Sequence, residues 1–142
     1  MAPILDFPDL LACAEKSATI TTPCNCIAMP LPGWESWPPT LREEHLHKLG
    51  TLAQVPEDEA TLDEYHPDGT TFWSPNAPIA ARYYPYNQSE LWACGNCGRA
   101  YLRFDDHGGY HCERRIRTLD AGLLVDAPWP AIKAKGSAVL AD

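Results

Sequence analysis

The sequence contains no apolar run long enough to span a membrane, because about 20 consecutive apolar residues are needed to cross the hydrocarbon core. It also lacks a basic N-terminal region followed by an apolar stretch, which is the pattern of a secretory signal peptide. We therefore expect a cytoplasmic protein with no membrane partner. Thiols stay reduced in that compartment, so the six cysteines are expected to be available to a metal ion rather than held in disulfides.

Basic residues are scarce in this chain. Lys and Arg together number 11 against 19 Asp and Glu, which gives a formal net charge of −8 at pH 7. Such a chain lacks the general electrostatic footprint of a nucleic-acid-binding protein. A local group of arginines could still hold a single strand beside Tyr101 and Tyr110, but pairing with the abundant carboxylates is the favoured interpretation. These arginines are Arg99, Arg103, Arg114, Arg115 and Arg117.

The composition does not indicate long regular elements. Proline accounts for 14 residues and glycine for 9, and both interrupt helices and strands, so we expect short helices joined by long proline-rich loops. At this length the chain is expected to form a single domain, residues 1–142. A metal ion suits such a domain, because loops bury less apolar surface than packed helices. Residues 128–142 are expected to form a flexible tail.

What the sequence does contain is a tight cysteine pair, Cys94 and Cys97. A Cys-x-x-Cys segment that bends sharply can direct both sulfur atoms at one metal ion. Gly95 and Gly98 provide conformational freedom after each cysteine, and they leave backbone N–H groups free to donate hydrogen bonds to the thiolates. The flanking residues alternate as strands do, whereas a redox Cys-x-x-Cys is expected at the start of a helix.

A second close pair, Cys24 and Cys26, offers the remaining ligands of a structural zinc site, which usually needs four. Residues two apart in an extended segment point to the same side, so Cys-x-Cys can present two thiolates to one ion. We therefore predict a closed tetrahedral Zn²⁺ site that staples the domain. Its ligands are Cys24, Cys26, Cys94 and Cys97.

A different ligand set would use residues that follow the Cys94 and Cys97 pair directly. His107, His111 or Cys112 could replace one of the proposed ligands. His111 and Cys112 are adjacent, so they point to opposite faces of a strand and only a bulge would let both bind. Thiolates also suit iron, so the choice between zinc and iron stays open at this point.

The remaining pattern predicts an α+β fold: a small antiparallel β meander that carries the zinc knuckle. Pro8 and Asp9 begin a short helix within residues 1–18. Thr40 and Glu43 form a capping box that predicts a second helix over residues 41–49, ending at Gly50. The aromatic rings of the proline- and tryptophan-rich residues 29–39 are expected to be buried. Strands are expected over residues 70–73, 79–84, 90–93, 99–104 and 110–118, the last three forming the meander.

Two stretches resemble known proteins. The sequence Cys94-Gly95-Asn96-Cys97-Gly98, with Tyr101 after it, resembles the knuckle of rubredoxin and zinc-ribbon proteins, which implies a metal but no particular function. A longer tract, residues 82–117, resembles small bacterial proteins of the accessory or immunity type, found near secreted toxins. The resemblance is carried by Arg82-Tyr83-Tyr84-Pro85-Tyr86-Asn87, by Gly108-Gly109-Tyr110 and by Arg114-Arg115-Ile116-Arg117. In that group the place of His111-Cys112 need not hold ligands, which favours the pairing with Cys24 and Cys26.

These observations favour a non-enzymatic zinc-binding protein that acts through protein–protein interaction. The specific expectation is a bacterial immunity protein that neutralises a secreted toxin. A closed site of four thiolates leaves no position for a reacting water, so no catalytic residue is predicted. An acidic stretch is the candidate surface for a basic toxin domain. Its predicted partner-binding residues are Glu57, Asp58, Glu59, Asp63 and Glu64.

Two other functions compete with this one. A zinc-ribbon nucleic-acid-binding module would use the arginines of residues 99–117. A small zinc metalloenzyme would need an open coordination position and a nearby carboxylate. Asp105, Asp106, His107 and His111 lie close enough in the sequence to serve. The His-x-Glu pattern of zinc deaminases does not occur in the chain.

Overall fold

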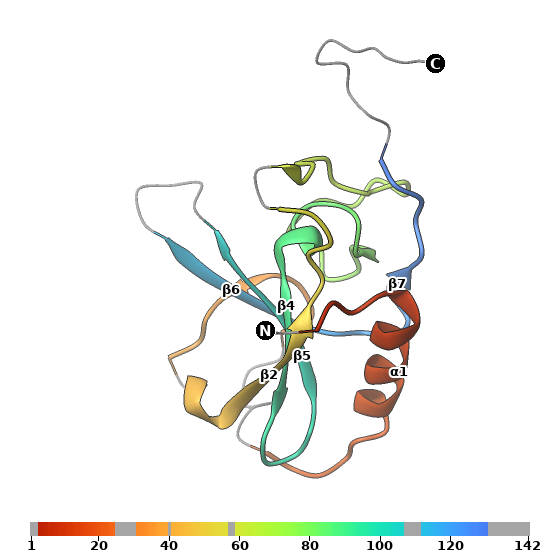
Figure 1. Cartoon of the computed structure of the whole chain (residues 1–142). Helices are drawn as coiled ribbons and strands as arrows, with labels where there is room; N and C mark the ends of the chain where they lie inside the picture. Colours follow the sequence, from red (N-terminus) through yellow and green to blue (C-terminus); the bar gives the residue numbers. More distant parts are fainter. Residues whose placement is uncertain (1–2, 25–30, 40, 57–58, 107–111, 131–142) are drawn as a thin grey trace, which may run out of the picture.

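The computed structural model describes residues 3–24, 31–39, 41–56, 59–106 and 112–130. These residues form one α-helix, α1 (Phe7–Ala18), and a five-stranded antiparallel sheet in the strand order β1-β6-β5-β4-β2. Figure 1 shows the helix packed beside the sheet. The predicted α+β class is therefore confirmed. None of the helices in the described part of the chain is long and apolar enough to cross a membrane.

Three consecutive strands form the centre of the sheet and confirm the predicted meander. β4 pairs with β5 and β5 pairs with β6, both antiparallel. The strands of the sheet are β1 (Glu35–Ser36), β2 (Leu46–Thr51), β4 (Glu90–Cys94), β5 (Ala100–Asp106) and β6 (Glu113–Thr118). A separate parallel pair consists of β3 (Ile79–Ala80) and β7 (Leu124–Val125). Two short 3₁₀ helices complete the described elements, η2 (Glu43–His45) and η4 (Tyr86–Gln88).

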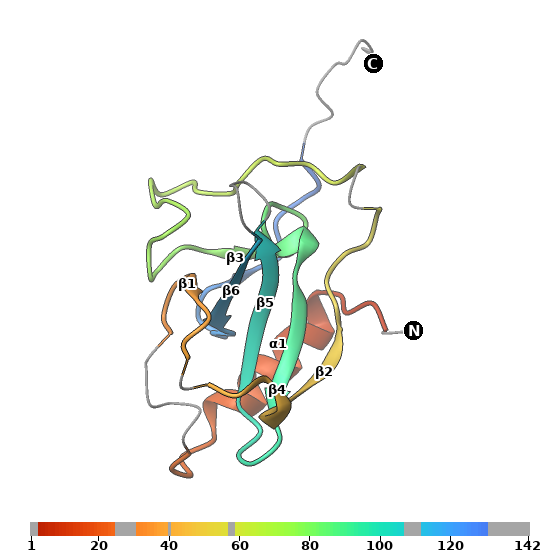
Figure 2. The ribbon, with the colours of Figure 1, turned by 90° about the vertical axis from the view of Figure 1, so that its left-hand side faces the viewer.

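Helix α1 begins at a reciprocal pair of hydrogen bonds. The Asp6 side chain accepts from the backbone N–H of Asp9 at 3.2 Å, and the Asp9 side chain accepts from the N–H of Asp6 at 3.3 Å. This arrangement satisfies two N–H groups that a helix start otherwise leaves without partners. The helix predicted within residues 1–18 is confirmed. It passes behind β4 and β5 in Figure 2, and its buried residues are Leu10, Ala14 and Ser17.

The main hydrophobic core lies between α1 and one face of the sheet, around Trp34. The Trp34 side chain is 2% exposed, and its ring meets Phe104 edge-on at a centroid distance of 4.8 Å and Tyr86 at 5.6 Å. Because side chains alternate along a strand, Leu102 and Phe104 of β5 both point into this core. The burial predicted for the aromatic loop is confirmed for Trp34, whereas Trp37 is half-buried.

A second, smaller apolar cluster lies on the opposite face of the sheet. Cys94 and Tyr101 point to this face because they alternate along β4 and β5 with residues of the main core. The chain before β2 covers the cluster, since β1 pairs with β6 and the Trp37 N–H donates to the Arg114 carbonyl at 2.9 Å. The sheet is therefore covered on both faces around Cys94. The buried members of the cluster are Leu31, Leu41, Leu46, Cys94, Tyr101 and Ile116.

The helix predicted over residues 41–49 is wrong. Only η2 is helical there, and the chain continues as strand β2, paired with β4. The capping box is a local signal, and pairing with a neighbouring strand overrode it. Thr40, the first residue of that capping box, lies outside the described residues. Gly50 is not a helix cap. It lies within β2, where a Cβ atom would come 2.7 Å from the Pro3 carbonyl oxygen, so close backbone approach requires glycine.

One further predicted strand is wrong, and another is shorter than predicted. Residues 70–73 form part of a turn in which the Ser74 N–H donates to the Thr71 carbonyl at 3.1 Å. Of residues 79–84, only the first two form a strand, because the Tyr83 N–H donates to the Ala80 carbonyl at 3.0 Å and turns the chain. The side chains of residues 81–84 are half-buried without a strand partner, so strand propensity alone misleads.

The ends of the last two predicted segments fall partly outside the described residues. The strand predicted over residues 110–118 is observed as β6, and residues 110 and 111 are not described. Of the tail predicted over residues 128–142, residues 131–142 are not described. At residues 128–130 the ring of Trp129, 53% exposed, lies beneath the Arg82 guanidinium at 5.1 Å.

Candidate metal centre

The turn of residues 94–97 joins β4 to β5 and presents Cys94 and Cys97. The Cys94 N–H donates to the Arg99 carbonyl at 2.9 Å, and the Gly98 N–H donates to the Cys94 carbonyl at 2.8 Å. Gly98 has φ +90°, a conformation that a residue with a Cβ atom rarely adopts. These bonds hold the two cysteines on one short, closed turn.

The N–H groups of Gly95 and Gly98 both donate to backbone carbonyls. The Gly95 N–H donates to the His45 carbonyl at 2.8 Å, and the Gly98 N–H donates within the turn to Cys94. The predicted hydrogen bonds from backbone N–H groups to the thiolates stay a prediction. For Gly95, η2 and β2 lie against the turn and offer a backbone acceptor, which the local sequence could not indicate. The bond to His45 ties the turn to the neighbouring strand.

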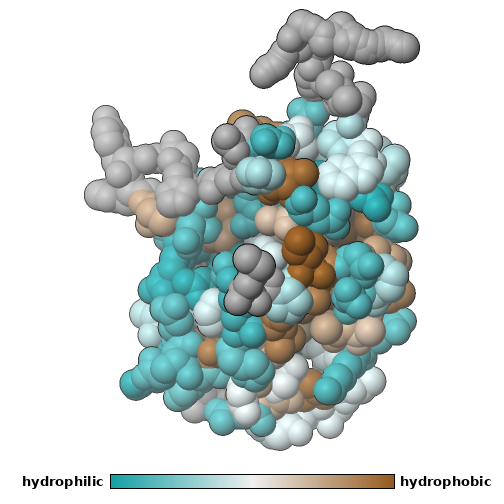
Figure 3. Space-filling model, viewed as in Figure 1, coloured by the Kyte–Doolittle hydropathy of each residue, from teal (hydrophilic) through white to brown (hydrophobic). Residues whose placement is uncertain are grey.

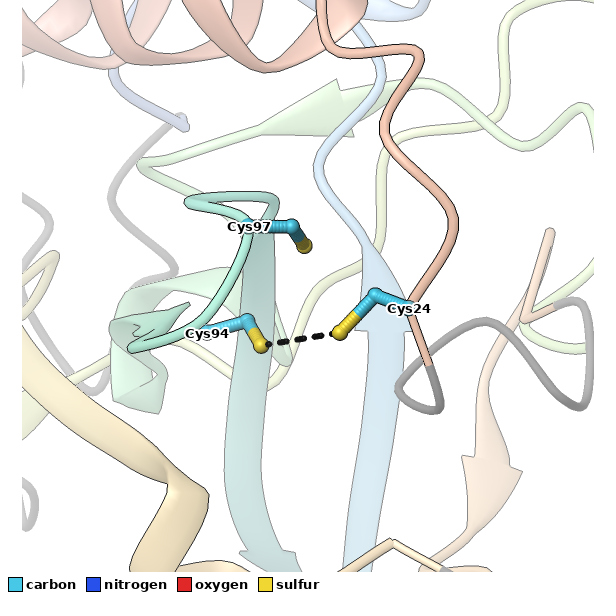
Figure 4. A group of neighbouring side chains, drawn as sticks. All are labelled: Cys24, Cys94 and Cys97. Atoms are coloured by element: carbon cyan, nitrogen blue, oxygen red, sulfur yellow. Dashed lines mark hydrogen bonds between the residues drawn. The ribbon is translucent and has the colours of Figure 1, made fainter.

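Cys24 meets the 94–97 turn from a distant part of the chain. Figure 4 shows its side chain pointing at Cys94 and Cys97, and the three sulfur atoms all lie within 4.8 Å of one another. The Cys24 and Cys94 sulfur atoms are 3.6 Å apart. A disulfide bond is only about 2.05 Å long. Two thiolates on one tetrahedral zinc ion lie about 3.8 Å apart, given a Zn–S bond of about 2.3 Å. The observed separation matches ligands that share an ion.

The cluster of sulfur atoms lies against the smaller apolar cluster of the sheet. Cys94 is 2% exposed, and Cys24 and Cys97 are half-buried. Leu46 pairs with Cys94 across β2 and β4, so an aliphatic side chain lies directly beside the innermost thiol. The apolar cluster therefore shields Cys94 from water, whereas Cys24 and Cys97 are partly open to solvent.

The structure brings together three of the four cysteines predicted to bind metal. Cys26, the fourth, lies outside the described residues, so its part in the site stays a prediction. Within the described part of the chain, no histidine or carboxylate places a ligand atom within 4.8 Å of all three sulfur atoms. Cys26 is two residues from Cys24, which keeps it the first candidate for the fourth position.

Cys112 does not belong with these three cysteines. It precedes Glu113, whose Cα partner is Asp106 at one end of the β5–β6 pair, whereas Tyr101 pairs with Thr118 at the end near the 94–97 turn. Five residues along a strand span about 17 Å. Cys112 is also exposed. This register excludes the alternative ligand set that includes Cys112. It also places Asp105 and Asp106, proposed for a metalloenzyme, away from the sulfur atoms. His107 and His111 lie outside the described residues.

Cys13 is half-buried in α1 and packs against the main core. Burial raises the pKa of its thiol above the usual value, and the nearby Asp9 carboxylate acts in the same direction. A higher pKa lowers the fraction of thiolate, which is the nucleophilic form. Cys13 is therefore a packing residue with little nucleophilic character.

The predicted partner-binding residues differ in their exposure and in their contacts. Glu59 and Glu64 are exposed, and the Glu64 carboxylate pairs with the His66 ring at 2.7 Å. Asp63 is half-buried, and its carbonyl accepts a hydrogen bond from the Tyr84 N–H at 2.8 Å. Glu57 and Asp58 lie outside the described residues. Between these acids, the Leu62 side chain is 71% exposed.

Two arginines of the predicted basic group share one carboxylate. Arg103 and Arg114 both donate to Glu43, at 3.0 and 2.5 Å. Both guanidinium groups also lie over the Trp37 ring, at 4.9 and 5.2 Å from its centroid. Hydrogen bonds from Arg114 and then Arg103 hold the pKa of the Glu43 carboxyl below its usual value. This network fastens η2 and the segment before it over the smaller apolar cluster.

The next two arginines point toward the opposite face. Arg115 pairs with Asp106 at 3.4 Å. Arg117 is fully buried, and its Nη1 and Nη2 atoms donate to the Tyr86 hydroxyl at 2.7 Å and the Pro32 carbonyl at 2.9 Å. Arg115 and Arg117 lie two residues apart on β6 and share a face, and Arg117 faces the main core rather than solvent.

Arg99 has a role that the sequence reasoning missed. The sequence indicates only a place in a basic surface, whereas the guanidinium donates to the carbonyl groups of Ile20 and Thr22, just before Cys24. The available signal was its place directly after Gly98, at the point where the turn ends.

In comparisons with known proteins, no family model matches the chain, and neither a curated protein nor a solved structure matches it significantly.

Proposed function

We propose that this protein binds one structural zinc ion through Cys24, Cys94 and Cys97, with Cys26 as the fourth ligand. The meeting of Cys24 with the 94–97 turn is the observation that carries the proposal. The ion would join the segment after α1 to the centre of the sheet. Because the ligands come together only in the folded chain, the free energy of metal binding would add directly to the stability of the fold.

A structural role is supported by the surroundings of the sulfur atoms. A catalytic zinc ion keeps an open position for water and usually has a carboxylate nearby. The described thiols instead lie against apolar side chains, and the two aspartates considered for catalysis lie toward the far end of β5. Cobalt substitution tests this point. We expect the absorption of a four-coordinate thiolate site that is insensitive to added anions, whereas a five-coordinate or water-exchanging spectrum would favour an enzyme.

Elemental analysis decides the identity of the ion. Protein purified without added metal is expected to contain one zinc ion per chain and to be colourless. Iron bound by thiolates would instead give strong visible absorption, because iron accepts charge transfer from sulfur and zinc does not. A well-folded protein that contains neither metal would overturn the proposal.

We further propose that the protein acts by binding a basic protein partner rather than by catalysis. Residues 49–81 contain six acidic residues and no lysine or arginine, so they account for −6 of the net charge of −8. Glu59, Glu64 and the exposed Leu62 lie in this segment. The face drawn in Figure 3 is mostly hydrophilic, with apolar side chains in a narrow band. Charge would therefore guide association more than apolar area would.

The specific form of this proposal is an immunity protein that neutralises a basic secreted toxin domain, as the resemblance to immunity-type proteins implies. Affinity capture from the native host is expected to recover a basic protein. The double variant Glu59→Gln/Glu64→Gln should bind that protein more weakly and with less dependence on salt. Glu15→Gln/Glu35→Gln removes the same charge from exposed sites elsewhere and should bind normally. Equal binding by both variants would exclude residues 59–64 from the interface.

A nucleic-acid-binding function is less well supported. Arg103 and Arg114 are engaged by Glu43, Arg115 by Asp106, and Arg117 is buried. Binding to nucleic acid is driven by cations that can release counterions from phosphate. A gel-shift experiment at low salt tests this alternative, and the expected result is no shift of single-stranded DNA or RNA.

A further inference from the structure

We propose that Arg99 is a positioning residue of the metal site, which brings Cys24 to the 94–97 turn before an ion binds. The use of this arrangement rests on the proposed metal function. The hold of Arg99 on the arm can also be tested on its own, in a chain without metal. It concerns the two parts of the site that lie farthest apart in the sequence, the arm of residues 20–24 and the turn between β4 and β5.

The guanidinium of Arg99 holds the arm at two points. Its Nη1 atom donates to the Thr22 carbonyl at 2.8 Å, and its Nη2 atom donates to the Ile20 carbonyl at 3.1 Å. Carbonyl groups two residues apart in an extended segment point to the same side, so one planar guanidinium can bond to both. Hydrogen bonds from a charged donor are stronger than those between neutral groups.

Arg99 is itself fixed to the turn that carries the other cysteines. Its carbonyl accepts the N–H of Cys94 at 2.9 Å, the bond that closes the turn. The same residue therefore closes the turn with its backbone and holds the arm with its side chain. Only Pro23 separates the last carbonyl it holds, that of Thr22, from Cys24. The distance left for the chain to cover between the held carbonyl and the thiol is short.

Two further contacts place the start of the arm. The Ser17 hydroxyl, at the end of α1, accepts the Ala100 N–H at 3.0 Å, and Ser17 is 8% exposed. The Cδ1 atom of Ile20 lies 3.4 Å from where a Cβ atom of Gly98 would be, so the arm packs closely on the turn. With Arg99, these contacts hold the chain at residue 17, at the end of α1, and at residues 20 and 22 of the arm. The sulfur atom of Cys24 then lies 3.6 Å from that of Cys94.

Preorganisation of this kind strengthens binding, because the ion need not order the arm itself. Replacing Arg99 by methionine keeps most of the apolar stem and removes the donors. Loss of two charged hydrogen bonds in a partly exposed setting is expected to weaken binding of zinc and cobalt by about 10- to 100-fold. The metal affinity of Arg99→Lys should fall between those of the wild type and Arg99→Met, since an ammonium group cannot bond to both carbonyls in the same fixed geometry.

Arg82→Met is the matched control. Arg82 is also half-buried and also donates to a backbone carbonyl, that of Ala127, at 2.9 Å. Metal affinity is measured in the full chain by competition with a chromophoric chelator. Near-ultraviolet absorption of the cobalt form reports the number of thiolates bound. Arg99→Met is expected to lose affinity and thiolate absorption together, and Arg82→Met to keep both. An equal loss in both variants, or no loss in Arg99→Met, would overturn the assignment.

A measurement without metal separates this inference from the proposed function. In a chain that keeps only Cys24 and Cys94 and has serine at the other four cysteines, oxidised glutathione can form the Cys24–Cys94 disulfide. The two thiols lose two electrons and two protons, and glutathione disulfide is reduced to two glutathione thiols. The equilibrium constant is the effective concentration of one thiol at the other. It should fall about tenfold when Arg99→Met is added and stay constant when Arg82→Met is added.

The outcomes of the two experiments are distinct. If the wild-type chain binds neither zinc nor cobalt, the proposed function fails, and the disulfide equilibrium still tests the arm. If metal binds but Arg99→Met changes neither affinity nor the disulfide equilibrium, the inference fails and the metal site stands. If the chain with serine at four positions does not fold, the metal affinities of the single variants decide.

Discussion

The sulfur atoms of Cys24 and Cys94 lie 3.6 Å apart although 70 positions separate these residues in the chain. Closing a loop of that length has a substantial entropic cost. In this protein the cost is offset by the packing of α1 on the sheet and by hydrogen bonds from the sheet to residues 17–22. The candidate metal site is therefore built at the point where the N-terminal segment is joined to the meander, and an ion there would reinforce that junction.

Substitution of the cysteines tests whether these two segments share one ion. Cys24→Ser and Cys94→Ser should each reduce bound metal to well below one ion per chain and lower the stability of the protein, because structural metal binding contributes to folding. Metal content and thermal unfolding are the measurements. Cys112→Ser is the control, since Cys112 is exposed at the other end of β6. If that variant lost as much metal as Cys94→Ser, the ligand assignment would be wrong.

Removal of the metal should destabilise the fold without destroying α1. Treatment with a strong chelator under reducing conditions is expected to lower the melting temperature by about 10 °C or more. Re-addition of one equivalent of zinc should restore it. The N-terminal capping bonds of α1 involve only Asp6 and Asp9, so its helical circular dichroism is expected to persist at low temperature. A melting temperature that does not respond to the chelator would contradict a structural ion.

Arg117→Met should be strongly destabilising. The Arg117 side chain is fully buried, and its removal leaves the Tyr86 hydroxyl and the Pro32 carbonyl without their donor. Tyr86 is buried whereas Pro32 is exposed, and one unsatisfied buried polar group costs about 1–3 kcal/mol, so a loss of about 1–3 kcal/mol in the free energy of unfolding is expected. Arg115→Met, two residues away on the same strand and partly exposed, should cost less than about 1 kcal/mol. Denaturant unfolding of both variants provides the comparison.

The Glu43 carboxylate should make stability depend on pH in the acidic range. Hydrogen bonds from Arg114 and Arg103 lower its pKa in the folded state. The folded chain therefore holds this carboxylate ionised where the unfolded chain takes up a proton. Its stabilising contribution is complete above the unfolded pKa of about 4.3 and is lost as the pH falls through the lower, folded pKa. Because the group is about half exposed, the effect should stay within about 1 kcal/mol.

Glu43→Gln tests this dependence. The wild-type chain should be more stable than the variant at pH 7, and the difference should shrink as the pH falls below 4. Glu15→Gln serves as the control, because Glu15 is exposed and no described residue forms an ion pair with it. Urea unfolding at several pH values measures the difference. A gap between wild type and Glu43→Gln that grows on acidification would show that the sign is wrong.

Local sequence was enough to predict the parts of the fold whose causes are local. Pro8 and Asp9 predicted the helix within residues 1–18, because signals for a helix start act within a few residues, although the cap itself is Asp6. Alternation on both sides of the cysteine pair predicted β4, β5 and β6. The sequence also predicted that Cys24 lies with Cys94 and Cys97. That prediction is chemical rather than local, because a structural metal ion needs several thiolates and these can come from distant parts of the chain.

The tertiary structure decided whatever depends on a neighbour from elsewhere in the chain. Residues 46–51 became β2 instead of a helix because β4 offers an unpaired edge, and the Gly95 N–H turned to His45 for the same reason. Arg117 is buried because the chain around Pro32 and Tyr86 closes over it. The hold of Arg99 on residues 20 and 22 likewise joins segments nearly 80 positions apart. Such contacts have no local signature, since their energy exists only after the chain has folded.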